Sequence, residues 1–133
     1  ESDAIAPIWH AYDLHSIYLC SPTTSDERMA MINQYGGGYL YFVSLKGVTG
    51  SSDFNLEHVK ELYHHRKSQT QLPLMVGFGI KTPEMAAEVA QFADGVIVGA
   101  ALISRIFEAY TTSANALAAG ASLIHDMRLA MDK

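Results

Sequence analysis

Residues 72–84 read LPLMVGFGIKTPE, and this stretch decides the fold class. An apolar run leads into the glycines of segment 77–79 (GFG), so we predict a buried strand over 74–77. Segment 82–84 (TPE) then supplies a capping hydroxyl, a proline at the first helical position and a first-turn acid, which together predict the start of a helix. Glycines on both sides of an aromatic ring leave the backbone bare where the strand ends, so a ligand or another chain segment can approach it closely.

Further strands of the same kind flank this stretch on both sides. Each is a short apolar run, and each is followed by residues with helical spacing. The last is continuously apolar, which is typical of a strand in a parallel sheet that is covered on both faces. The predicted strands cover 16–20 (SIYLC), 39–44 (YLYFVS) and 95–98 (GVIV).

The predicted helices begin with recognisable caps. Thr24 and Glu27 form a capping box at the first crossover helix, and Asp53 can cap the second. A helical pattern also precedes the first strand, and a further amphipathic helix is predicted over 113–131. The predicted order is therefore a helix, four β-α units and a terminal helix.

Repeated β-α units predict an α/β fold in which helical crossovers join parallel strands. Two architectures are built from such units. One is a flavodoxin-like open sheet of about five strands, and the other is a (β/α)8 TIM barrel, which needs about 250 residues, so that this chain would supply half of it. Spacing alone does not decide between them. No linker-like stretch divides the chain, so residues 1–133 are predicted to form one structural unit.

The composition is that of an ordinary globular protein, with 133 residues, 49% hydrophobic and 17% charged. A net charge of −5 argues against nucleic acid or an anionic membrane surface as a partner. Cys20 is the only cysteine, which excludes an intramolecular disulfide and favours a reducing, cytoplasmic setting. No apolar stretch reaches the roughly 18 residues that span a bilayer. The opening residues, ESDAIAPIWHAYD, lack a methionine and read as helix, so we expect a processed or truncated polypeptide.

Glycine-rich segments follow three of the predicted strands, at 47–50 (GVTG), 77–79 (GFG) and 99–101 (GAA). Glycine lets backbone N–H groups approach a ligand, and a following helix N-terminus adds partial positive charge. Three such strand ends together predict a phosphate cradle that needs no lysine or arginine, and a barrel carries its usual phosphate site after its last two strands. The alternative for each glycine taken singly is a tight turn between strand and helix.

Other motifs are incomplete or ambiguous. Segment 77–82 begins like a dinucleotide fingerprint, but Thr82 stands where the third glycine is needed, and no P-loop occurs. Tyr41, near the carboxyl end of its strand, is a candidate to contact a substrate and is equally well read as a core tyrosine. Phe78 is the better candidate for a ring that touches a ligand, because its glycine neighbours supply no side chain to shield it.

Groups that could move a proton are not found where the cradle is predicted. Asp94 precedes its strand, which places it at the opposite, stabilising end of the sheet. His64 and His65 cannot share a helix face, so no metal site is expected. Cys20 lies within a strand and is interpreted as a small core residue rather than a nucleophile.

The segments YLYFVSLKGVTG, LPLMVGFGIKTPE and ADGVIVGAALI, in this order and at these separations, resemble the C-terminal half of the tryptophan synthase alpha chain family. SIYLCSPTTSDERM is similar to the fifth strand and helix of that family, so the resemblance covers essentially the whole chain. It implies a (β/α)8 barrel of which this chain supplies the last four β-α units and the closing helix.

The resemblance also implies a function. Such proteins are cytoplasmic lyases that cleave indole-3-glycerol phosphate into indole and glyceraldehyde 3-phosphate, in a heterotetramer with a beta chain that carries pyridoxal phosphate. No cofactor is then expected in this chain. The substrate-binding residues implied are Gly50, Gly79, Gly99 and Ala100 for the phosphate, Tyr41 near the substrate, Phe78 on the indole side, and Thr49 in a mobile loop.

Two departures from the family pattern follow. Ala100 stands where the family usually has serine, so a hydroxyl contact worth about 1–3 kcal/mol would be lost. The catalytic glutamate and aspartate of the family lie on the second strand and the loop after it, so this chain alone is expected to be inactive. Its two sheet edges, near Ser16 and Gly95, are expected to associate with the other half of the barrel, or with a second copy of this chain if that half is absent. The alternatives are another phosphate-binding barrel enzyme, or a weakened subunit that mainly activates its partner.

Overall fold

The computed structural model describes residues 2–43, 56–77 and 79–132. Within these ranges four parallel strands form one sheet in the order β1-β2-β3-β4, so each strand lies beside the next one in the chain. This confirms the predicted succession of parallel β-α units. The strands are β1 (Tyr18–Cys20), β2 (Leu40–Phe42), β3 (Leu74–Val76) and β4 (Gly95–Val96).

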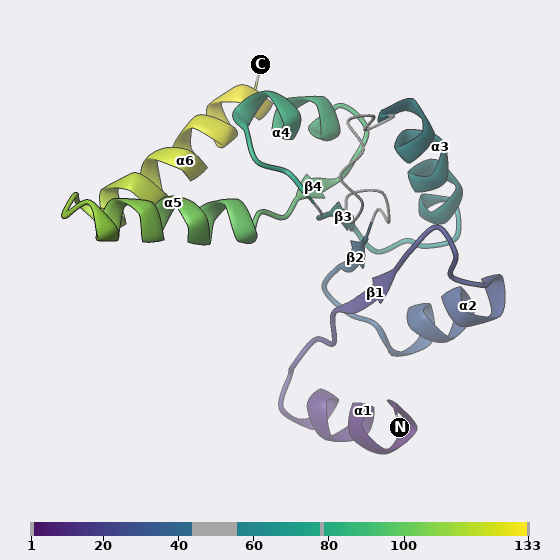
Figure 1. Cartoon of the computed structure of the whole chain (residues 1–133). Coiled ribbons are helices and arrows are strands. Elements are labelled where there is room, and N and C mark those ends of the chain that lie inside the picture. Colours follow the sequence, from purple (N-terminus) through teal and green to yellow (C-terminus); the bar gives the residue numbers. More distant parts are fainter. Residues whose placement is uncertain (1, 44–55, 78, 133) are drawn as a thin grey trace.

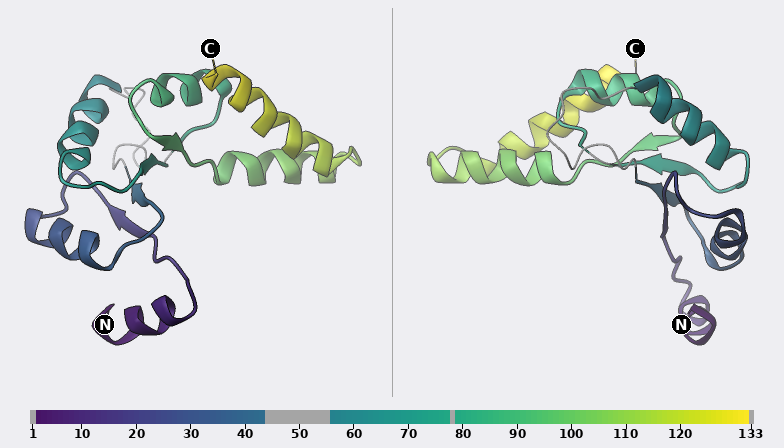
Figure 2. Two further views of the ribbon diagram at one scale, coloured as in Figure 1. Left: turned by 180° about the vertical axis from the view of Figure 1, so that it is seen from behind. Right: turned by 45° about the vertical axis from the view of Figure 1, so that its right-hand side comes forward.

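The helices follow one another around one side of the sheet, and the other side is open between α1 and α5 (Figure 1). Three helices connect consecutive strands, one helix precedes β1 and two follow β4. The views in Figure 2 show the same arc, with α1 beyond the β1 edge. The helices are α1 (Ser2–Ala11), α2 (Asp26–Tyr35), α3 (Leu56–Lys67), α4 (Pro83–Ala90), α5 (Ala100–Thr111) and α6 (Ala116–Met131).

The register of the sheet separates a buried face from an open one. Cys20, Phe42 and Val76 pair across β1, β2 and β3, and all three are buried in the cluster that the helices complete. The adjoining row, Leu19, Tyr41 and Met75, points to the other face because side chains alternate along a strand. Leu19 in this row is 62% exposed, although a parallel sheet is normally covered on both faces. The open face is therefore an incomplete inner surface.

Several predicted boundaries are wrong by a few residues. The cap of α2 is Ser25, whose hydroxyl accepts the Arg28 N–H at 3.2 Å, whereas Thr24 accepts the Ser21 N–H at 2.9 Å and so belongs to the preceding turn. The last helix begins at Ala116 rather than 113, because Ser113 has a φ of 57°, which no helix accommodates. The predicted cap Asp53 lies outside the described residues.

The four strands are all shorter than predicted, and β4 is the shortest. Within the described sheet, β4 has two residues paired with β3, whereas the other edge strand, β1, has three paired with β2. Among the described helices, none is both long enough and apolar enough to cross a membrane.

Candidate functional site

The predicted residues Gly79 and Gly99 come to lie at the carboxyl ends of neighbouring strands. β3 and β4 pair in parallel with Val76 opposite Val96, so the segments after them leave the sheet at the same edge. In α/β folds of this kind, ligands bind at that edge. The structure therefore places these two predicted residues at the same edge of the sheet.

Both glycines border empty space. Gly79 has a φ of +67°, a left-handed conformation that glycine adopts without strain. Among the described residues other than its chain neighbours, a Cβ atom built on Gly79 or on Gly99 would meet no heavy atom within 4 Å. Both residues are exposed, so their backbone groups are accessible to a small ligand.

The N-termini of α4 and α5, which lie at this edge, differ in whether nearby side chains accept hydrogen bonds from their first backbone N–H groups. At α4 the Thr82 hydroxyl accepts the Met85 N–H at 3.3 Å. Glu84 stands in the same turn, where its own backbone N–H and then the Thr82 hydroxyl lower the pKa of its carboxyl group. At α5 the cap is Gly99, which has no side chain, and the first turn, starting at Ala100, contains no acid. The free N–H groups of α5 can therefore bind an anion, while α4 already holds a carboxylate.

Gly77 serves packing rather than the ligand. The expectation from the sequence was that both Gly77 and Gly79 would offer amides to a phosphate, but the Gly77 N–H donates to the Phe42 carbonyl at 3.2 Å within the sheet. A Cβ at Gly77 would lie within 3.0 Å of the hydroxyl oxygen and ring carbon Cζ of Tyr41, and 3.0 Å from the Cβ of Ile97. The Tyr41 ring therefore crosses the inner face of the sheet directly over Gly77.

The remaining predicted site residues, Thr49, Gly50 and Phe78, lie outside the described residues. Tyr41 is half-buried in the middle of β2, on the open inner face. Within the ranges that the structure describes, no three His, Cys, Asp or Glu side chains come together in a way that could hold a metal ion.

The groups predicted to lie away from the site do so. Asp94 stands at the amino end of β4, where its carboxylate accepts the Leu74 N–H at 2.7 Å and pairs with Lys67 at 2.7 Å. Cys20 is buried, and its burial raises the pKa of the thiol to about 11 against a smaller opposing effect of the Arg66 charge. The thiol is thus protonated at neutral pH and is no nucleophile.

Two buried polar residues were not identified from the sequence. Tyr63 donates its hydroxyl to the Leu74 carbonyl, and the same oxygen accepts the Asp94 N–H. Arg66 is 6% exposed and donates to Asp26, to Gln69 and to the carbonyl of Pro22. Their helix, α3, shows apolar spacing at Tyr63, but the sequence contains no local signal for partners that are 11 to 44 residues away.

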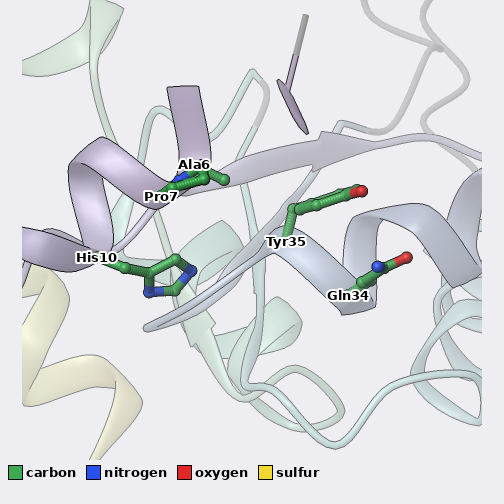
Figure 3. Close-up of a pocket in the computed structure, with 5 residues that line it drawn as sticks. All are labelled: Ala6, Pro7, His10, Gln34 and Tyr35. Atoms are coloured by element: carbon green, nitrogen blue, oxygen red, sulfur yellow. The ribbon is translucent and has the colours of Figure 1, made fainter. Parts of the chain in front are cut away.

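A separate hollow of about 390 Å³ lies between α1 and α2 (Figure 3). Gln34 and Tyr35, at the end of α2 and near the amino end of β2, point away from His10 in this view. A binding site for a small molecule needs polar groups that converge, and these do not. The hollow also contains none of the predicted site residues; its lining is Ala6, Pro7, His10, Gln34 and Tyr35.

Comparison with known proteins gives consistent matches over this whole length. The family model described as "Tryptophan synthase alpha chain" matches residues 1–132. The tryptophan synthase alpha chain of Legionella pneumophila (strain Lens) is 61% identical over 132 residues, which are 99% of this chain and 48% of the relative. That of Methylococcus capsulatus (strain Bath) is 42% identical over 132 residues, 99% of this chain and 49% of the relative. The chain thus spans about half the length of the curated relatives it matches.

Solved structures give the same result. The crystal structure of tryptophan synthase subunit alpha from Legionella pneumophila strain Paris superposes with a TM-score of 0.91 at 56% identity, covering 99% of this chain and 48% of that one. Tryptophan synthase from M. tuberculosis, in an open form with BRD0059 bound, gives a TM-score of 0.77 at 26% identity and covers 98% and 46%.

These neighbours are (β/α)8 TIM barrels, which decides between the two architectures that spacing left open. The parallel sheet of β1 to β4 with its helices fits the C-terminal half of such a barrel. Because the family model spans residues 1–132 and the fold agrees, the chain belongs to the tryptophan synthase alpha chain family.

Proposed function

We propose that the intact protein is a carbon-carbon lyase that cleaves indole-3-glycerol phosphate to indole and glyceraldehyde 3-phosphate, and that this chain supplies the phosphate side of its site. Membership of the family supports a role in tryptophan biosynthesis. The observation that carries the proposal is the pair of hollow glycines, Gly79 and Gly99, on adjacent strand ends beside the uncapped N-terminus of α5.

In this proposal neutral backbone groups bind the phosphate. The N–H groups of Gly79, Gly99 and Ala100 donate to its oxygens, and the α5 dipole favours the negative charge. Gly50, in the segment that follows β2, is proposed to add a fourth donor. Ala100 lacks the serine hydroxyl of the family pattern but keeps its backbone N–H.

The aromatic end of the substrate is proposed to lie toward the inner face of the sheet. Tyr41 lies on this face, against Gly77, which is one residue from Phe78. Both rings are assigned to the indole side, and Thr49 to a loop that closes over the substrate. The catalytic carboxylates that the resemblance implies belong to the other half of the barrel, so this chain by itself is proposed to bind but not to turn over the substrate.

The open inner face is proposed to receive that other half. Helices already stand beyond both edge strands, α1 beyond β1 and the α5–α6 pair beyond β4 (Figure 2). The other half of the barrel must therefore begin and end with a strand, so that its edge strands can pair with β1 and β4. A second copy of this chain begins and ends with helices, and these would be surplus where the two sheets meet. Exposed apolar residues on the two flanking helices are available to contact that half: Ile5, Ile8 and Trp9 on α1, with Tyr12 just after it, and Ile103, Phe107 and Tyr110 on α5.

A tryptophan synthase beta chain that carries pyridoxal phosphate is the proposed second partner. Related solved structures include tryptophan synthase from M. tuberculosis in an aminoacrylate-bound form. A second candidate function, a weakened subunit that mainly activates this partner, is favoured by Ala100 alone. Ala100→Ser separates the two, because it should leave a full lyase nearly unchanged but raise the lyase rate of a weakened subunit at least tenfold.

The decisive experiment tests the phosphate site with a pair of substitutions of equal size. Inorganic phosphate is titrated into the intact protein while the amide chemical shifts of Gly79 and Ala100 are followed. Gly99→Asp and Gly99→Asn both fill the space beside Gly99, but only the aspartate repels the anion. We expect at least tenfold weaker binding for the aspartate than for the asparagine variant. Equal affinities, or no shift of either amide in the wild type, would refute the proposed site.

A further inference from the structure

The two strands that carry the hollow glycines share the shortest ladder of the sheet. β3 and β4 pair through Met75 with Gly95 and Val76 with Val96, and the Ile97 N–H donates to the Val76 carbonyl at 2.9 Å. β4 is also an edge strand with no neighbour on its other side in the described sheet. A ladder this short only weakly determines the register of β4, that is, its position along the strand direction relative to β3.

A buried tyrosine supplies an additional rung at the amino ends of these strands. The Tyr63 hydroxyl donates to the Leu74 carbonyl at 3.1 Å and accepts the Asp94 N–H at 3.0 Å. The Asp94 carboxylate in turn accepts the Leu74 N–H at 2.7 Å. Both backbone groups of Leu74 are thereby connected to Asp94, the residue just before β4, although no direct backbone pair joins the two residues.

The tyrosine is itself held rigidly. It is 1% exposed, and its ring meets Phe42 and Phe92 edge-on, with centroids 5.9 and 5.4 Å away. Burial, with the nearby Asp94 charge, raises the pKa of the hydroxyl to about 12, so that it keeps the proton that Leu74 requires. Tyr63 on α3 therefore ties one helix to two strands.

We infer that Tyr63 is a positioning residue for the phosphate site: it sets the height of β4 against β3, so that the backbone groups of Gly79 and Gly99 converge on one anion. The inference rests on the proposed function. A slip of one residue would move Gly99 by about 3.3 Å along the strand direction. Hydrogen bonds from N–H to oxygen operate within a range of about 0.5 Å, so even a fraction of that slip removes one side of the cradle.

The test compares two substitutions on α3 in the intact protein. Tyr63→Phe keeps the ring and removes only the hydroxyl, while Val59→Ala, one turn earlier, weakens the same core without touching a hydrogen bond. We expect Tyr63→Phe to weaken inorganic phosphate binding at least fivefold and to raise KM for indole-3-glycerol phosphate similarly, with kcat within twofold. We expect Val59→Ala to lower the melting temperature and to leave both binding values unchanged.

Hydrogen exchange provides a second readout that does not depend on the ligand. The Ile97 amide should exchange at least tenfold faster in Tyr63→Phe than in Val59→Ala. If Tyr63→Phe does not fold, Asp94→Ala loosens the same rung from its other end and should also weaken phosphate binding. Unchanged phosphate affinity in a folded rung variant overturns the positioning role alone, whereas a wild type that binds no phosphate overturns the proposed function first.

Discussion

Adding one methyl group at Gly77 should destabilise the protein more than the loss of a glycine normally does. The new Cβ would lie within 3.0 Å of the hydroxyl oxygen and ring carbon Cζ of Tyr41, a spacing that real Cβ atoms essentially never show, and at a tight 3.0 Å from the Cβ of Ile97. These neighbours yield less easily than an unbranched side chain, because the tyrosine ring moves only as a rigid unit and the Ile97 Cβ is attached directly to the backbone. We therefore place Gly77→Ala at roughly 2–3 kcal/mol, the upper part of the range for overpacking.

Gly95→Ala is the matched control. Its Cβ would instead meet the sulfur of Met75, the far part of a flexible side chain that can rotate away. We expect a cost below about 1 kcal/mol for this substitution. Gly77 and Gly95 both lie on the inner face of the sheet. Comparing their alanine variants therefore separates the cost of a rigid neighbouring side chain from the cost of replacing a glycine.

The assay is urea unfolding of the intact protein, followed by circular dichroism, for the two alanine variants and for Gly77→Ala combined with Tyr41→Leu. Removing the ring should recover about 1–2 kcal/mol of the Gly77→Ala penalty, which a double-mutant cycle reports as a coupling between the two sites. Stability is the proper readout because Tyr41 is also assigned to the substrate. Equal costs at Gly77 and Gly95, or additive behaviour of the double variant, would show that the ring does not set the limit.

Three further outcomes are expected. Asp94→Asn should lower the free energy of unfolding at pH 7 by about 0.5–1 kcal/mol, the scale of a partly exposed pair. Burial raises the pKa of the Asp94 carboxyl, but hydrogen bonds from Lys67 and the Leu74 N–H lower it overall. The difference in stability should therefore shrink as the pH falls below 3.8, the ordinary pKa of aspartate, and a constant difference would contradict this. Cys20 should react with a thiol reagent only in denaturant, because burial raises its pKa to about 11; reaction in the native protein would show that the thiol is accessible. The half of the Legionella alpha chain that this chain does not match should form a 1:1 complex with it, measured by light scattering. Leu19→Asp, on the inner face of the sheet, should weaken this complex, whereas Met31→Asp, at an exposed apolar position on α2, should not. A stable homodimer would argue against the proposed fit.

Local patterns predicted the features that depend on neighbours in the chain. Thr82 caps α4 as expected, since the hydroxyl and the N–H that it accepts are three residues apart. The same logic chose Thr24, which has Glu27 three residues later, over Ser25, and it was wrong because the Thr24 hydroxyl accepts the Ser21 N–H in the preceding turn while Ser25 caps the helix. The placement of Gly79 and Gly99 at one edge was predictable because strand direction alone determines it.

Contacts between distant segments could not be predicted in this way. The bonds from Tyr63 to Leu74 and Asp94 join residues 11 and 31 apart, and Arg66 reaches Pro22 across 44. Gly77 was expected to face a ligand, but the reason for its small size is a ring from the neighbouring strand. Such contacts depend on which side chains the fold brings together, and neither periodicity nor capping rules contain that information.

The unfilled volume beside Gly99 has a consequence for evolution. Gly99 has a φ of −115°, outside the left-handed range, and a Cβ atom built there would meet no heavy atom of the described residues within 4 Å, apart from its chain neighbours. If Gly99 binds the phosphate as proposed, mutations at this position can alter which esters are accepted with little effect on the packing of the described residues. Substrate preference could then change through substitutions at Gly99 alone, without an evolutionary intermediate that has lost stability.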